Sequence, residues 1–152
     1  MQTRRHALKQ GLATATVLGS GAVFTVPAHA FNKNAFEAKT VQEALKALGG
    51  SGSLAESKDV TISGPDIAEN GAVVPIGAGT TMAGIKQLAL LVEKNPNTLV
   101  AVFNVNENIE PNFLTRAKMG QSSDVYAVAI ANDGKAYYAK KEIKVTLGGC
   151  GG

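Results

Sequence analysis

Between residues 58 and 147, hydrophobic and polar residues alternate in short runs that turn-forming residues separate. Alternation with a period of two is typical of strands with one buried face, and short strands at regular spacing predict an all-β sandwich. The pattern predicts about seven strands arranged as in an immunoglobulin-like fold. The runs that we interpret as strands cover residues 60–62, 72–76, 85–93, 99–105, 113–119, 125–131 and a last run ending at Leu147.

Some of these runs carry signals about their place in the sheets. Pro75 cannot donate a main-chain hydrogen bond, so its run is expected at an edge or a bulge. Residues 85–93 also fit a helical period, but a strand is favoured because Asn-Pro-Asn at 95–97 and the next run then complete a hairpin. Asn132-Asp133-Gly134 predicts a second hairpin. Gly77 and Gly79 lack the rest of a phosphate-binding motif and are interpreted as a turn.

The segment 31–50 is predicted to be a short N-terminal helix. Its hydrophobic residues recur at helical spacing along one face. Thr40 to Glu43 matches a capping box, and Gly49-Gly50 ends the helix. We expect this helix to pack on the core of the domain, with packing on a partner protein as the alternative.

Residues 1–30 are typical of a cleaved export signal. Basic residues at positions 4, 5 and 9 precede an apolar stretch at 11–26, and Ala28-His29-Ala30 provides a cleavage pattern that predicts a mature chain starting at Phe31. Arg4-Arg5 resembles a twin-arginine signal, with Ala7 where a large apolar residue is usual. A plain secretory signal is the alternative. The apolar stretch is too short for the roughly 20 residues that span a bilayer.

Removal of this leader changes the expected chemistry. The formal charge of +3 falls to zero, because the leader holds three basic residues and no acid. No basic excess is left to bind nucleic acid or an anionic membrane. Both histidines, His6 and His29, also lie in the leader, so residues 31–152 cannot form a Ser-His or Cys-His pair or an imidazole metal site.

The remaining polar residues give no catalytic or metal site, and we expect no cofactor. The loop carboxylates are scattered and are interpreted as solvated; they are Asp66, Glu69, Glu107, Asp124 and Asp133. The lysines near the end of the last strand predict a solvated face; they are Lys140, Lys141 and Lys144. Tyr137 and Tyr138 are interpreted as ordinary sandwich residues.

Cys150 is the candidate functional residue. It lies within Gly148-Gly149-Cys150-Gly151-Gly152, where glycines cannot bury it and confer the freedom of a flexible arm. Three residues from Leu147 extend about 10 Å, enough to enter the cleft of another protein. No basic residue adjoins the thiol, so activation must come from that cleft. The arm therefore predicts a carrier and not a catalyst; an inert or merely dimerising thiol is the alternative.

These features together resemble the SoxY family of sulfur carriers in thiosulfate oxidation. The resemblance covers the whole chain and rests on the leader, on residues 92–96 (Val-Glu-Lys-Asn-Pro), on Lys144-Val145-Thr146 and above all on the Gly-Gly-Cys-Gly-Gly arm. It implies an immunoglobulin-like domain paired with the small protein SoxZ. It further implies a cysteine S-thiosulfonate on Cys150 in the periplasm, loaded by the cytochrome complex SoxAX, hydrolysed by SoxB and in some organisms oxidised by a sulfur dehydrogenase.

Two other functions are compatible with parts of the sequence. A ubiquitin-like sulfur carrier would use a thiocarboxylate on Gly152, although an export signal and the lack of external ATP disfavour it. An adhesive immunoglobulin-like module would carry the cysteine incidentally.

Overall fold

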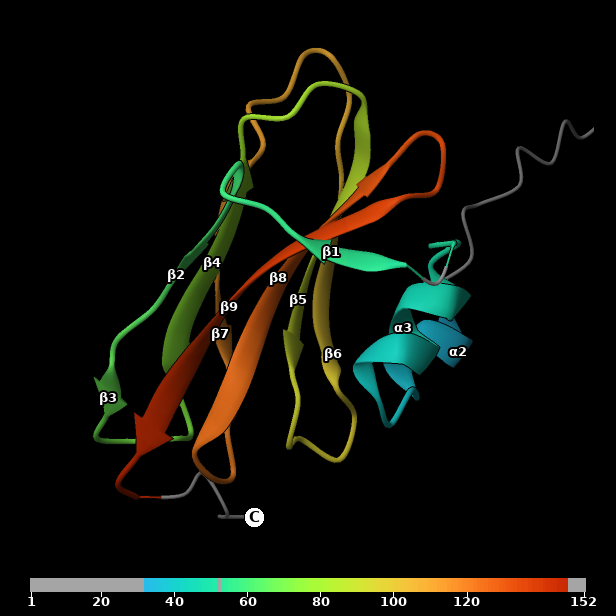
Figure 1. Ribbon diagram of the computed structural model, residues 1–152. Coiled ribbons are helices and arrows are strands. Elements are labelled where there is room, and N and C mark those ends of the chain that lie inside the picture. Colours follow the sequence, from blue (N-terminus) through green and yellow to red (C-terminus); the bar gives the residue numbers. More distant parts are fainter. Residues whose placement is uncertain (1–31, 52, 148–152) are drawn as a thin grey trace, which may run out of the picture. The chain divides into compact units, whose positions relative to one another are not determined.

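A computed structural model describes residues 32–51 and 53–147, which form a sandwich of two β-sheets (Figure 1). The larger sheet has the order β1 (Leu54–Glu56), β9 (Ala136–Val145), β8 (Ser123–Ala131), β5 (Ile85–Val92) and β6 (Leu99–Asn104), and β3 (Ile67–Ala68) also pairs with β9. The smaller sheet has the order β2 (Val60–Ser63), β4 (Val74–Thr80) and β7 (Asn112–Ala117).

The main hydrophobic core lies between the two sheets. Ile76 of β4 is fully buried against the larger sheet, which contributes Leu88, Leu90 and Ile143 to the same cluster. Each of these side chains lies on the inward face of its strand, as the period of two requires. The predicted immunoglobulin-like sandwich is therefore confirmed.

All seven predicted strands form, and residues 85–92 are a strand rather than a helix. β5 pairs with β6 as the expected hairpin, with a bulge at Leu90–Leu91. The structure adds two strands that the pattern did not predict, β1 and β3. Both are very short and both pair in parallel with β9, β1 at its start and β3 at its end (Figure 1).

β4 corrects two details of the prediction. It is the central strand of the smaller sheet and not an edge strand. At Pro75, however, β4 pairs only with β7, because its pairing with β2 begins at Gly77. Pro75 is thus tolerated where the strand has one neighbour. Gly77 and Gly79 form no turn; both lie inside β4. A Cβ at Gly77 would come within 2.5 Å of Leu114 Cδ2, so glycine serves there for close packing of strands.

The hairpin between β8 and β9 is confirmed. The N–H of Gly134 donates to the carbonyl of Ala131 at 2.9 Å, and the N–H of Ala131 donates to the carbonyl of Lys135 at 2.9 Å. Gly134 has a φ of +85°, a conformation that glycine adopts without steric cost. The turn chemistry read from the sequence therefore fixes the register of the two longest strands.

The predicted N-terminal helix is two helices, α2 (Lys33–Phe36) and α3 (Val41–Ala47). The capping box explains the break: the side chain of Thr40 accepts from the N–H of Glu43 at 3.2 Å, so a new helix begins there. At the other end, Gly49 has a φ of +80°, and the N–H of Gly50 donates to the carbonyl of Leu45 at 2.9 Å. This is the expected glycine stop.

Both helices pack on the outer face of the larger sheet, which confirms the expected core packing (Figure 1). Ala44 and Leu45 of α3 are buried in a second cluster with Leu91, Val128 and Ile130 of the sheet. The link between the helices also bonds to the turn between β5 and β6, because the N–H of Thr98 donates to the carbonyl of Ala38 at 3.0 Å. Within the described ranges, no helix is long and apolar enough to cross a bilayer.

Candidate functional site

The predicted functional residues lie just beyond the described part of the chain. Cys150 and the arm glycines Gly148, Gly149, Gly151 and Gly152 are outside the described residues. What the structure describes is the base of the arm, which we define as Thr146 and Leu147 together with the loop 68–71 that contacts them. The end of β9 and this loop lie close together beside the label β3 in Figure 1.

Hydrogen bonds to main-chain carbonyls hold the base of the arm beyond the end of β9. The N–H of Thr146 donates to the carbonyl of Ala68 at 3.1 Å, and the Thr146 hydroxyl donates to the carbonyl of Glu69 at 3.1 Å. The carbonyl of Leu147 accepts from the N–H of Gly71 at 2.8 Å. The chain is therefore fixed to the sandwich as far as Leu147, three positions before the thiol.

The loop that receives these bonds is itself held by the neighbouring loop 119–122. The carbonyl of Gly71 accepts from the N–H of Met119 at 2.7 Å, and Met119 is fully buried. The hydroxyl of Ser122 accepts from the N–H of Val145 at 2.9 Å. Sequence reasoning missed this base because it depends on β3, whose two residues carry no alternating pattern.

Hydrophobic side chains are exposed around the base. Leu147 is 70% exposed, although it continues the alternation of Ile143 and Val145 along the chain. Leu147 lies past the end of β9, so it no longer follows the strand's alternation. Ile67, next to Ala68, is 58% exposed, and Val73, two residues after Gly71, is 55% exposed.

One charged pair lies beside the base. The Nζ of Lys141 lies 2.8 Å from Asp66 Oδ1 and donates to the carbonyl of Gly64 at 2.7 Å. The hydrogen bond from Lys141 to Asp66 and the charge of the lysine hold the pKa of Asp66 below its ordinary value. Lys141 thus links β9 to the segment that leads into β3, which gives this lysine a structural role.

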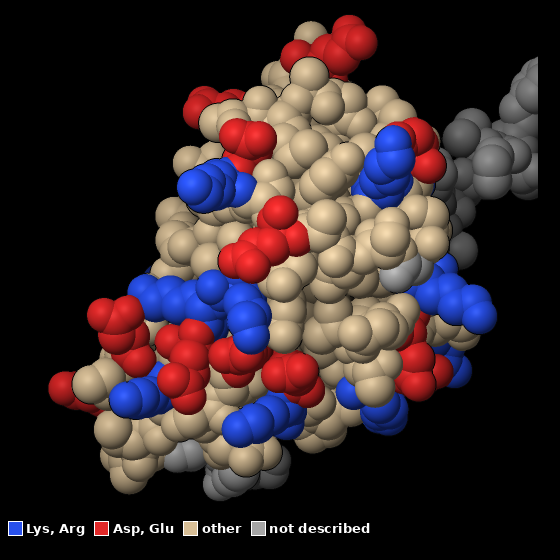
Figure 2. Space-filling view, in the orientation of Figure 1, with Lys and Arg blue, Asp and Glu red and all other residues tan. Residues whose placement is uncertain are grey.

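The outer face of β8 and β9 carries a second pair. The Nζ of Lys140 lies 3.0 Å from Asp124 Oδ2 and 5.9 Å from the ring centroid of Tyr126. The contact with Asp124 raises the pKa of Lys140. Burial, and next the charge of Glu93, raises the pKa of Tyr126. Figure 2 shows basic and acidic side chains interleaved on the visible face, without a single-sign patch.

The candidate loop carboxylates do not converge on a common centre. Asp66, Asp124 and Asp133 each pair with a different lysine, at positions 141, 140 and 135. Among residues 32–51 and 53–147, no group of three His, Cys, Asp or Glu side chains could hold a metal ion. Tyr138 packs against Tyr126 with ring centroids 5.7 Å apart. Both rings are partly buried against the second cluster, which lies between the helices and the larger sheet.

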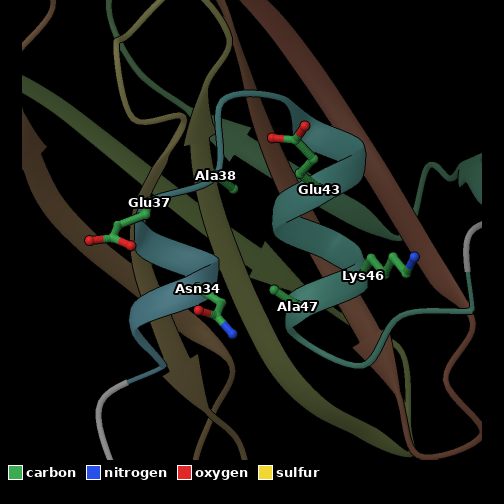
Figure 3. Close-up of a pocket in the computed structure, with 6 residues that line it drawn as sticks. All are labelled: Asn34, Glu37, Ala38, Glu43, Lys46 and Ala47. Carbon is green, nitrogen blue, oxygen red and sulfur yellow. The ribbon is translucent and has the colours of Figure 1, made fainter.

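A hollow of about 530 Å³ lies between α2 and α3 (Figure 3). Its acidic residues are engaged in local structure: Glu43 Oε2 accepts from the N–H of Lys39 at 2.9 Å, and Glu37 lies 3.6 Å from the Nζ of Lys33. Figure 3 shows Lys46 pointing away from Glu37 and Asn34. The hollow lies beside groups that serve the ends of the two helices, and it brings together no reactive groups.

A second hollow, of about 770 Å³, lies among loops at the other end of the strands from the base. Asn106, Asn108 and Asn132 line it together with Glu107 and Ile109. It contains amides and one carboxylate but no nucleophile, and Gly77 and Gly79 do not take part. The site that the sequence singles out therefore has no rival of comparable chemistry in the described residues.

Comparison with known structures defines the class of protein. The chain is similar to superoxide reductase (neelaredoxin) from Ignicoccus hospitalis, with 21% identity and a TM-score of 0.50 over 57% of this chain and 79% of that one. This likeness shows the fold alone. The two sheets and their topology place the chain among the immunoglobulin-like β-sandwich proteins.

Within that class the family is also shown. The profile of the family described as "Sulfur oxidation protein SoxY" matches residues 45–150. The chain is also similar to the sulfur carrier protein SoxY from Chlorobium limicola f. thiosulfatophilum, with 34% identity and a TM-score of 0.61 over 69% of this chain and 94% of that chain. No curated protein matches the chain significantly. This chain belongs to the SoxY family of sulfur oxidation proteins.

Proposed function

We propose that this chain is a covalent carrier of sulfur intermediates in thiosulfate oxidation and that Cys150 is the attachment site. The observation that carries the proposal is the junction at Leu147. The family match extends as far as Cys150, and the structure anchors the chain up to Leu147 by the bond from Gly71. A fixed base followed by glycines and one thiol suits a group that is presented to other proteins.

Loading is an oxidative conjugation. The thiolate of Cys150 and the outer sulfur of thiosulfate form one S–S bond, and two electrons leave: Cys–S⁻ + S–SO₃²⁻ → Cys–S–S–SO₃⁻ + 2 e⁻. A c-type cytochrome complex of the SoxAX type accepts the electrons. The carrier needs to supply only the thiolate, since no basic side chain adjoins Cys150 to activate it and residues 31–152 contain no histidine.

Unloading is a hydrolysis. Water attacks the terminal sulfone sulfur of Cys–S–S–SO₃⁻, the S–SO₃ bond breaks, and sulfate, two protons and the persulfide Cys–S–S⁻ are released. A SoxB-type hydrolase carries out this step, and a sulfur dehydrogenase, where the organism has one, oxidises the persulfide sulfur. The chemistry is thus done by partner enzymes, and this chain acts as the carrier that they share.

Family membership also supports two proposals about the setting. The carrier pairs with a SoxZ-type small subunit, and it works in the periplasm after export and cleavage of residues 1–30. N-terminal sequencing of the exported protein should begin at Phe31. Retention of residues 1–30 on the exported protein would contradict the proposed processing.

Intact mass spectrometry tests the carrier function. Protein from cells grown on thiosulfate should carry a thiosulfonate or persulfide mass that maps to Cys150 and disappears under a thiol reductant. Cys150→Ser should lose both the adduct and thiosulfate-dependent turnover in a reconstituted system, because a hydroxyl cannot form the S–S bond. An adduct on the Gly152 carboxylate would favour a thiocarboxylate carrier, and full activity of Cys150→Ser would exclude the proposal.

A further inference from the structure

Three of the five large hydrophobic side chains that are exposed in residues 32–51 and 53–147 lie around the base of the arm. Leu147 is part of the base, Ile67 precedes Ala68, and Val73 follows Gly71 by two residues. The base hydrogen bonds therefore bring segments from β3, from the start of β4 and from the end of β9 to one place. The other two, Ile109 and Leu114, lie in the loop before β7 and on β7.

The length of the arm limits where a receiving enzyme can sit. Cys150 is three residues from Leu147, so the thiol reaches at most about 10 Å from the anchored chain. An active-site cleft deep enough to exclude water around the sulfur uses most of that length. The rim of any such cleft must then contact the surface immediately around Leu147.

We propose that Ile67, Val73 and Leu147 form the docking surface for the rim of the active-site cleft of the enzymes that act on Cys150. This inference rests on the proposed carrier function and names the surface that this function uses. The occupant is an apolar rim, because the three exposed side chains that we assign to the surface are aliphatic, and Asp66, which precedes Ile67, is paired with Lys141 at 2.8 Å.

The size and chemistry of this surface suit a carrier that visits several enzymes in turn. Three partly exposed aliphatic side chains bury little area, which is typical of weak, short-lived encounters. Burial of apolar area is non-directional, so rims of different shape can use the same contact.

Sulfate release by a purified SoxB-type hydrolase provides the test. Tetrathionate loads the full carrier chemically, since the Cys150 thiolate attacks a central sulfur, Cys–S–S–SO₃⁻ forms and thiosulfate leaves. The double variant Val73→Asp with Leu147→Asp should lower kcat/KM for sulfate release about tenfold, through KM, with little change in kcat. Leu147→Met, which keeps the aliphatic surface, should behave like the wild type.

Matched controls separate docking from folding and from the chemistry of the thiol. Ile109→Asp and Leu114→Asp introduce the same charge at exposed hydrophobic residues away from the base and should leave kcat/KM unchanged. All variants should keep the melting temperature and the rate of Cys150 alkylation by iodoacetamide. Normal kcat/KM in the double variant would overturn the docking surface. No sulfate release from loaded wild-type protein would instead overturn the carrier function.

Discussion

The N–H of Gly71 donates to the carbonyl of Leu147 at 2.8 Å, so the loop before β4 holds the last described residue before the glycine arm. Leu147 has its carbonyl fixed in this way while its side chain is 70% exposed. The anchored domain and the arm therefore meet at one defined position, and truncations on either side of it should differ.

Truncation after Leu147 should leave the melting temperature within a few degrees of the wild type, because no bond of the base is lost. Truncation after Val145 removes the three bonds of Thr146 and Leu147 with the loop. At about 1 kcal/mol each or somewhat less, this loss should lower the melting temperature by roughly 5–10 °C. Thermal unfolding measures both, and equal melting temperatures for the two truncations would show that the base is not anchored.

Gly77→Ala should destabilise the smaller sheet by about 1–3 kcal/mol. The new Cβ would lie 2.8 Å from the carbonyl oxygen of Phe113, in addition to its clash with Leu114, and a backbone atom cannot move aside. Gly79→Ala is the matched control, since its nearest atom is the Thr61 hydroxyl oxygen at 2.8 Å, which can rotate away. Urea unfolding should show the larger loss for Gly77→Ala; an equal or reversed order would exclude backbone crowding as the cause.

The pair of Lys141 and Asp66 should make a small, pH-dependent contribution to stability. The pKa of Asp66 is lowered in the folded chain, so the stabilisation is present above the ordinary value of 3.8 and is lost as the pH falls through the lower folded value. Asp66→Asn should thus be slightly less stable than the wild type at neutral pH and equal to it in strong acid. Urea midpoints across this range measure the difference; a difference that persisted in acid would point to another origin.

Stiffening the arm should separate reach from reactivity. Gly149→Pro combined with Gly151→Pro restricts the backbone and widens the arm on both sides of Cys150. Alkylation of the thiol by iodoacetamide should keep its rate, while sulfate release by the hydrolase slows. A normal rate of release would show that flexibility of the arm is not required, although Cys150 could remain the attachment site.

The sequence predicted most of the sandwich because seven strands carry a clear alternation. Ile76 and Ile143 lie inward as their runs require. Gly77 was assigned to a turn because glycine is common there, although Val74, Ile76 and Ala78 continue the alternation through it. The prediction of a single N-terminal helix was wrong. The capping box at Thr40 marks the start of a second helix, and the prediction did not take this into account.

The candidate site also has one part that the sequence indicates and one part that it does not. Composition and position in the chain single out Cys150 as the candidate site, and this stays a prediction because Cys150 lies outside the described residues. The base of the arm could not be predicted from the sequence, because it depends on the pairing of the two residues of β3 with Lys144 and Val145, far along the chain. Such pairings follow from the whole fold, and two-residue strands leave no periodic signal.

The parallel pairing of β1 and β3 with β9 also constrains the order of folding. Leu54 pairs with Ala136, and Ile67 pairs with Lys144, so both early strands complete their ladders only after nearly the whole domain has been synthesised. Contacts between distant residues close slowly, since the entropy of the intervening loop opposes them. The base is therefore among the last parts to form, and a chain in which the base is complete has already finished folding.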